Sequence, residues 1–369
     1  MNIVAWGVVL GAILFSQSSF SYPDLSRHGY TNCTACHLSP SGGGLLTSYG
    51  RELSKEVLST WGKDGEQYFA YGKISHDENV LLGAYIRGLQ AYREDENKKD
   101  ARFILMQADI EAGYNSLKWA VAASLGRQEI RSGQSSEGRL VSRRFYLFYR
   151  PDEKWNLRVG KFLHFYGLND PNHYMYVRKD LNFGFDTETY NVEASFLGDR
   201  WNFYFTYSDG NLTRDKYAML KEQGGTASLS YFFLDKEKVG LSLYHGEDET
   251  NRRWVFGPSA ILSFSSKWFL LAEFDWQSKD LKSTQSNQQG YVTSSRLNYE
   301  WIQGLIGFIS YDKKFLNQVD ANTEQQSYGL GMQFFPRPHL EAIATWQKEE
   351  VIATRAKSDL VWLLLHFYL

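Results

Sequence analysis

From Val80 onward the sequence is a series of short segments in which apolar and polar residues alternate. Between Trp201 and Ser208, for example, Trp, Phe, Phe and Tyr fill one set of alternate positions, and Asn, Tyr, Thr and Ser fill the other set. A period of two places alternate side chains on opposite faces of a β-strand, whereas a helix has a period of 3.6 residues. The pattern therefore predicts strands that differ in polarity between their two faces.

About sixteen segments of roughly ten residues show this alternation, and turn residues separate them. The predicted strands are 80–92, 102–114, 117–130, 140–150, 155–166, 188–197, 201–208, 223–233, 239–246, 252–264, 267–277, 289–300, 304–311, 326–335, 339–347 and 358–369. Short connections alternate with longer polar ones, as in outer-membrane barrels with tight periplasmic turns and long outer loops. We therefore predict an all-β fold, a transmembrane antiparallel β-barrel over residues 80–369, with a soluble sandwich or propeller as the alternative.

The composition agrees with strands that meet a membrane interface. Aromatic residues make up 16% of the chain, supplied by 24 Tyr, 24 Phe and 11 Trp. Barrels of this class carry aromatic girdles at both membrane interfaces, with apolar residues facing lipid and polar residues facing the lumen. Because Lys plus Arg (40) nearly balance Asp plus Glu (42), we expect no nucleic-acid partner.

The longest connection, residues 167–187, carries several charged and aromatic side chains. Long loops of barrels usually lie on the surface, and this is the expectation here. The alternative is a loop that folds inward as a constriction, or that binds a metal ion or a partner at the mouth.

The chain begins with an almost wholly apolar run over residues 3–15, followed at once by small polar residues. Such a run is too short for a transmembrane helix, which needs roughly 20 residues. It is typical of a secretory signal. We therefore predict a signal peptide over residues 1–21, a mature chain that begins near Tyr22, and a location in the bacterial outer membrane.

Residues 22–79 lack the alternation of the barrel and hold the only two cysteines of the chain, in the sequence Cys33-Thr34-Ala35-Cys36-His37. In this spacing two thiols can add to the vinyl groups of haem while the adjoining histidine binds the iron. We predict one covalent haem c, with Cys33 and Cys36 as thioether residues and His37 as proximal iron ligand. A disulfide, a thioredoxin-like redox site and a zinc site are the alternatives.

The second axial ligand of the iron stays unassigned from sequence. None of the five methionines, a common choice, falls within residues 22–79. The candidates in that segment are His28 and His76. A ligand from the barrel, His164 or His173, or an open position is the alternative.

Three stretches carry a family resemblance: Arg27-His28-Gly29, the motif Cys33 to His37, and Leu46-Thr47-Ser48-Tyr49-Gly50-Arg51. They resemble the N-terminus of the fused monohaem cytochrome-porins of the outer membrane, whose best-known members are iron(II) oxidases. Ser48 stands where that family tends to have proline, and the glycine-rich stretch from Ser39 to Gly44 is an insertion. The resemblance implies a monohaem cytochrome plug over residues 22–79 more strongly than it implies iron oxidation.

Together these features predict an electron conduit of the outer membrane. The plug would lie in the barrel lumen or face the periplasm, and its partners would be membrane lipid, a periplasmic cytochrome or other electron carrier, and an extracellular redox partner such as ferrous iron. Iron(II) oxidation, or another extracellular electron-transfer reaction, is the enzymatic activity that this would allow. One alternative is a solute porin with an attached periplasmic redox or sensor cytochrome domain. Another is a plugged transporter whose motif has lost haem.

Overall fold

The computed structural model describes residues 23–74, 77–129, 138–172, 174–214, 218–234 and 236–369. The predicted signal peptide, residues 1–21, lies outside the described residues. No helix in the described part of the chain is long and apolar enough to cross a membrane.

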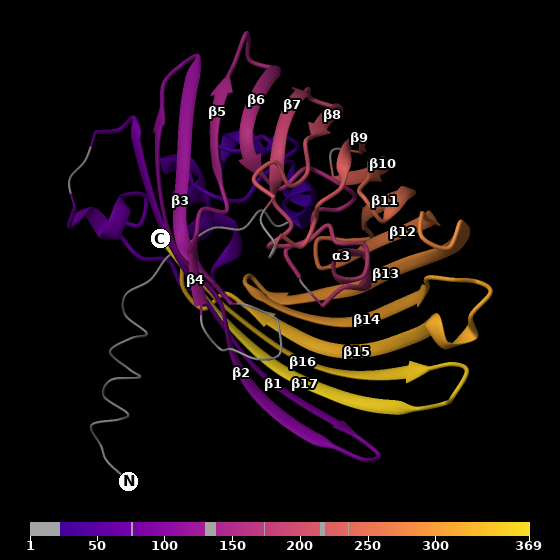
Figure 1. Ribbon diagram of the computed structural model, residues 1–369. Coiled ribbons are helices and arrows are strands. Elements are labelled where there is room, and N and C mark those ends of the chain that lie inside the picture. The colour runs from indigo at the N-terminus through magenta and orange to yellow at the C-terminus, as the bar shows by residue number, and fades with distance from the viewer. Residues whose placement is uncertain (1–22, 75–76, 130–137, 173, 215–217, 235) are drawn as a thin grey trace.

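The chain from Val80 onward forms one closed antiparallel sheet (Figure 1). Its strands are β1 (Val80–Asp95), β2 (Lys99–Asn115), β3 (Trp119–Glu129), β4 (Gly138–Val141), β5 (Phe145–Tyr149), β6 (Trp155–Phe162), β7 (Thr189–Leu197), β8 (Trp201–Ser208), β9 (Gln223–Phe233), β10 (Glu237–Glu247), β11 (Asn251–Ser263), β12 (Trp268–Leu281), β13 (Ser286–Ile302), β14 (Leu305–Phe315), β15 (Glu324–Phe334), β16 (Leu340–Val351) and β17 (Lys357–Tyr368). β4 and β5 both pair with β3 and are two parts of one interrupted strand, so the barrel has 16 strand positions.

The barrel closes because the last strand pairs with the first. Along β1 and β17 the register runs from Tyr85 opposite Tyr368 to Asp95 opposite Ser358. A closed sheet leaves no unpaired edge, which is the condition for a sheet to cross hydrocarbon. The barrel predicted from the alternation is confirmed, and the sandwich and propeller alternatives are wrong.

The two faces of the strands differ as the alternation predicts. On β8, Trp201 is 49% exposed and Phe205 is 54% exposed, whereas Asn202 and Thr206 are buried. Exposed aliphatic and aromatic residues recur around the outer face of the other strands. A contiguous apolar outer surface of this kind is suited to contact with lipid.

The connection after β6 departs from its prediction. β6 ends at Phe162 rather than residue 166, and residues 163–172 and 174–188 fold into the barrel as an inward loop, which carries the short helix α3 (Tyr176–Lys179) inside the ring of strands (Figure 1). The expectation of a surface loop is therefore wrong. The physical reason is apolar burial: Val177, Leu181 and Phe183 are fully buried against the inner wall, which a solvated loop would not allow.

The residues ahead of β1 form short helices and turns. These are η1 (Pro23–His28), η2 (Cys33–Ala35), α2 (Ser48–Leu53), η3 (Ser54–Leu58) and η4 (Phe69–Gly72); a further short helix, η5 (Ala321–Thr323), precedes β15. The backbone of Thr60 donates to Phe335 O at 2.9 Å, and the Gln303 side chain donates to Ser59 O at 2.9 Å. Both barrel partners lie in short turns, so the N-terminal segment is attached at the short-turn end of the barrel.

From that end, part of the N-terminal segment reaches into the lumen. Leu38 and Leu45 are at most 1% exposed and pack against inward-facing residues of the barrel wall, which are Leu81, Ala120, Ala122, Tyr146, Phe148 and Phe162. The loop from Leu38 to Leu45 therefore lies inside the ring of strands, and we call the described N-terminal residues 23–74, which contain this loop, the plug.

Candidate functional site

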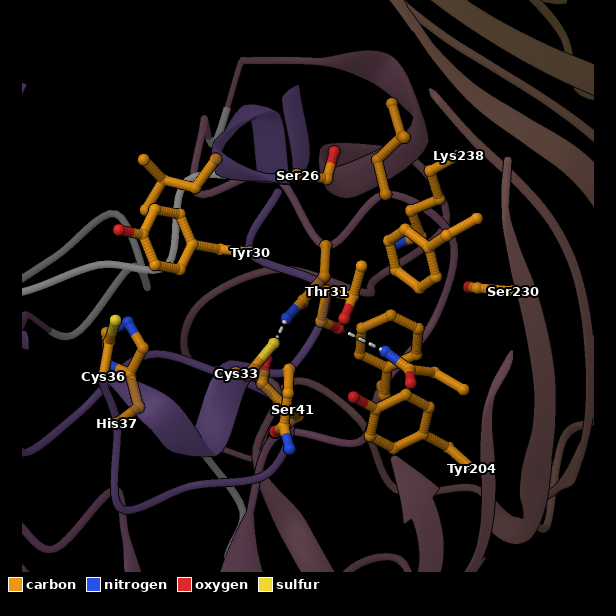
Figure 2. Close-up of a pocket in the computed structure, with 17 residues that line it drawn as sticks. Ser26, Tyr30, Thr31, Cys33, Cys36, His37, Ser41, Tyr204, Ser230 and Lys238 are labelled. Carbon is orange, nitrogen blue, oxygen red and sulfur yellow. Dashed lines mark hydrogen bonds between the residues drawn. The ribbon is translucent and has the colours of Figure 1, made fainter. Parts of the chain in front are cut away.

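The cysteine motif forms a tight turn at the start of the plug. Cys33–Ala35 is a single 3-10 turn whose N-cap, Asn32, accepts a hydrogen bond from Thr34 N at 2.9 Å. The next turn is closed by His37 N, which donates to Cys33 O at 2.9 Å. This turn brings Cys33, Cys36 and His37 to one cavity, and no disulfide joins the two cysteines (Figure 2).

The cavity lies between the plug, the inward loop and the barrel wall. The plug supplies the cysteine motif and the residues just before it, the loop supplies Phe165, Leu168 and Asn169, and the wall supplies residues of β8, β9 and β10. The cavity is partly open to solvent, and its lining combines apolar side chains with a few polar ones. Cofactor sites typically show this combination of apolar walls and a few polar groups.

The donor set at this cavity fits a covalent haem. His37 is 4% exposed, and among the described residues its Nδ1 atom has no hydrogen-bond partner. Burial lowers the pKa of His37 to about 4, with a smaller opposing effect of a hydrogen bond to the Gly44 backbone. The ring is therefore neutral at physiological pH, which is the form that binds metals.

The alternatives for the motif find less support. Cys33 and Cys36 are not joined by a disulfide. Burial raises the pKa of the Cys36 thiol to about 11, whereas dithiol redox sites depend on a lowered thiol pKa. In the described part of the chain no group of three or more His, Cys, Asp or Glu residues is placed to hold a metal ion, so neither a zinc site nor a metal site at the barrel mouth has a ligand set there.

The segment from Leu46 to Arg51 forms a clamp that packs against the backbone of the cysteine motif. Leu46 forms a β-bridge with His37, and Thr47 N donates to Cys36 O at 2.9 Å. The Thr47 hydroxyl also donates to Ala35 O at 3.0 Å and accepts from Gly50 N at 3.0 Å, so it caps α2. Ser48 is the first helical residue, a position that proline also favours, so its departure from the family pattern leaves this geometry intact.

Gly50 packs directly on the backbone of Cys36, and an added Cβ would overlap Cys36 O. We expect Gly50→Ala to loosen the clamp and to destabilise the plug by about 1–3 kcal/mol, the usual cost of overpacking. Limited proteolysis of the folded barrel measures this as faster cleavage within residues 23–74. Ser48→Ala, an exposed substitution in the same helix, is the control, and equal cleavage of the two variants would contradict the prediction.

Arg27, the first residue of the resemblance, anchors the plug to the barrel. Its guanidinium pairs with Glu300 at 2.5 Å, donates to Ser266 O at 3.1 Å and lies 4.5 Å from the ring centroid of Phe269. Gly29 follows with a φ of 86°, a left-handed conformation that glycine adopts without strain. These residues therefore hold the chain that leads into the cysteine motif.

The glycine-rich insertion is an ordered turn inside the lumen. Gly42, Gly43 and Gly44 have φ values of 75°, 71° and 70°. An added Cβ on Gly44 would lie 2.9 Å from Arg144 Nη1. Glycine is needed here both for the left-handed backbone and for the close approach to the barrel wall.

Buried polar side chains fix the same turn. Arg158 on β6 donates to Ser39 Oγ at 2.8 Å and Ser41 Oγ at 3.1 Å, and it pairs with Glu193 at 2.7 Å. The Tyr204 hydroxyl donates to Pro40 O at 2.8 Å. The barrel wall therefore holds the plug through hydrogen bonds as well as apolar packing.

The structure does not bring His28 or His164, two of the predicted axial histidines, to the cavity. His28 is exposed and is not among the residues that line it. His164 is buried and stacks on Tyr244 with ring centroids 5.6 Å apart, also away from the cavity. His76 and His173 lie outside the described residues. The described lining contains no methionine and no histidine other than His37.

Lys238, by contrast, lines the cavity and was missed by sequence reasoning. It lies at the second position of β10, one residue ahead of the strand predicted at 239–246. The one sequence signal was the alternation of the strand, which, extended back by one residue, places Lys238 on the inward face.

No protein-family model and no curated protein matches the chain. Its structure is similar to solved outer-membrane structures, among them OmpT of Vibrio cholerae, with a TM-score of 0.61 and 10% identity over 80% of this chain and 100% of that chain. OprB of Pseudomonas putida matches with a TM-score of 0.61 and 8% identity over 79% of this chain and 94% of that chain.

An anion-selective porin from Comamonas acidovorans matches with a TM-score of 0.58 and 11% identity over 79% of this chain and 99% of that chain. At these identities the likeness concerns the fold. The barrel therefore has the architecture of an outer-membrane porin.

Proposed function

We propose that the protein is an outer-membrane electron conduit. One haem c, attached at Cys33 and Cys36 and bound through its iron by His37, would connect an extracellular donor or acceptor, such as ferrous iron, with a periplasmic cytochrome or another electron carrier. Such a cofactor supplies one-electron redox chemistry whose potential depends on its ligands and surroundings. The observation that carries the proposal is that both thiols and the imidazole face one cavity enclosed by the barrel wall.

Because the cavity lies inside the barrel, the barrel would hold the redox centre within the membrane layer. The hydrocarbon layer is roughly 30 Å thick, so a single redox centre serves both sides only from within that layer. The lumen is narrowed by the plug from the short-turn end and by the inward loop from within. The two segments meet where Asn169 Nδ2 donates to Ser41 O at 2.9 Å.

The surrounding residues would position the cofactor and limit its contact with water. Phe165 and Tyr204 stack with ring centroids 4.1 Å apart at one wall of the cavity. Near its rim, Tyr49 donates to Tyr30 at 3.4 Å, a contact exposed to solvent. A soluble carrier would therefore approach from the rim, on the side that carries the plug.

Proteoliposomes test the proposal. Vesicles carrying the purified protein would enclose a soluble c-type cytochrome, and ferrous iron or dithionite would be added outside. We expect reduction of the enclosed cytochrome, seen by absorbance, with the wild-type protein and no reduction with a Cys33→Ser, Cys36→Ser double variant. Equal rates for the two proteins would mean that the reductant leaks through the barrel, and the proposal would be wrong. Reduction by dithionite but not by ferrous iron would exclude iron(II) oxidation and would leave the electron-conduit proposal standing.

A second candidate function is a solute porin with an attached periplasmic redox or sensor domain. The likeness of the barrel to channel proteins, including the anion-selective porin, favours it. In that case the lumen would be open, and the intact protein would carry a large steady ion current in a planar bilayer. The packing of Leu38 and Leu45 inside the barrel favours the conduit, because a domain hanging in the periplasm would leave these contacts unmade.

A further inference from the structure

One charged side chain of the cavity has no counter-charge. Lys238 is 8% exposed, and in the described part of the chain no carboxylate lies within ion-pair distance of its amine. Its amine lies 5.4 Å from the ring centroid of Phe165 and 6.0 Å from that of Phe232. Aromatic faces attract a cation, but this attraction offsets only part of the hydration free energy that a buried ammonium group loses.

Three buried arginines on or near the inner wall are paired with glutamates. Arg158 meets Glu193 at 2.7 Å, Arg178 meets Glu273 at 3.3 Å, and Arg253 meets Glu222 at 2.7 Å. A buried charge is costly unless it is paired, so Lys238 would gain from a partner that is not a protein side chain.

Most other polar groups of the cavity already have partners. Asn202 donates to Thr31 O at 2.6 Å, Tyr204 donates to Pro40 O at 2.8 Å, and the Asn32 side chain accepts from Thr34 N at 2.9 Å. The amine of Lys238 is thus the one nitrogen donor of the described lining, besides His37, that could bind iron. Figure 2 shows His37 and Lys238 on opposite sides of the cavity, with Cys33 between them.

We infer that Lys238 supplies the second axial ligand of the haem iron, opposite His37. This inference rests on the proposed function, because it requires the covalent haem. A lysine amine binds a metal through its nitrogen lone pair once the proton has left, and coordination removes the need for a buried counter-charge. The competing role, pairing of the ammonium with a haem carboxylate, needs only the positive charge.

Three substitutions separate the two roles. Lys238→Arg keeps the charge but cannot bind iron, because the guanidinium stays protonated. Lys238→Ala removes both functions, and Lys238→Met offers a thioether, another axial ligand of iron. Lys236→Ala, an exposed lysine in the preceding hairpin, is the matched control. Each full-length protein is purified in detergent, its covalent haem is measured after denaturation, and the spin state of the ferric iron is read by absorption and electron paramagnetic resonance.

We expect wild type and Lys236→Ala to be low-spin, and Lys238→Ala and Lys238→Arg to become high-spin and to bind added cyanide faster, all with unchanged covalent haem. Lys238→Met should be low-spin with altered resonance values. A low-spin Lys238→Arg would overturn the inference and favour the carboxylate pair. A low-spin Lys238→Ala would also overturn it, because another group would then bind the iron. Wild-type protein without covalent haem would refute the proposed function itself, and the inference with it.

Discussion

Serine at both Cys33 and Cys36 is expected to yield a folded barrel that carries no covalently attached haem. Thioether bonds form only at sulfur, and the described part of the chain has no other cysteine. The loss should be complete in the double variant, whereas a single substitution leaves one thiol that can still form a bond. Haem staining of the denatured protein on a gel measures the result.

Folding of the same variant must be checked independently. The strands close through main-chain hydrogen bonds between β1 and β17 and through the other antiparallel pairs, none of which involves the cysteines. Folded and heat-denatured barrels therefore should differ in gel mobility for the variant as for the wild type. Haem staining that survives in the double variant would show that the motif is not the attachment site.

Deletion of residues 23–74 is expected to open the lumen, so that the blocked barrel becomes a conducting channel. The plug packs on the wall through Leu38 and Leu45, and Arg158 holds its turn. Without it, the inward loop of residues 163–172 and 174–188 remains in the lumen. In a planar bilayer we expect little current through the intact protein and large, steady channel events through the deletion variant.

The cysteine-to-serine variant is the control for that experiment, because it keeps the plug and lacks the haem. It should conduct as little as the wild type. If the intact protein conducts as well as the deletion variant, the plug does not close the lumen, and the solute-porin alternative is favoured.

Sequence patterns were most informative where a local chemical rule applies. Alternation along β8 predicts which of Trp201 and Asn202 faces outward, because side chains of a strand point alternately to its two faces. The cysteine motif predicts a haem, because its spacing suits two thioethers and one imidazole ligand, and this stays a prediction until haem is measured. The boundary at Phe162 was missed, since the apolar residues that follow it resemble a strand and the sequence does not show that they leave the wall.

Only the tertiary structure decided what surrounds the motif. The clamp of Thr47 and Gly50 on Cys36 joins segments that are separate in sequence, and the charge of Lys238 reaches the cavity only because β10 lies beside the plug. The sequence by itself determined the strands and the chemistry of Cys33, Cys36 and His37, because both follow from local spacing. The inward loop, the enclosed cavity and the unpaired amine depend on which distant side chains can be buried together, and burial is settled only when the barrel closes around them.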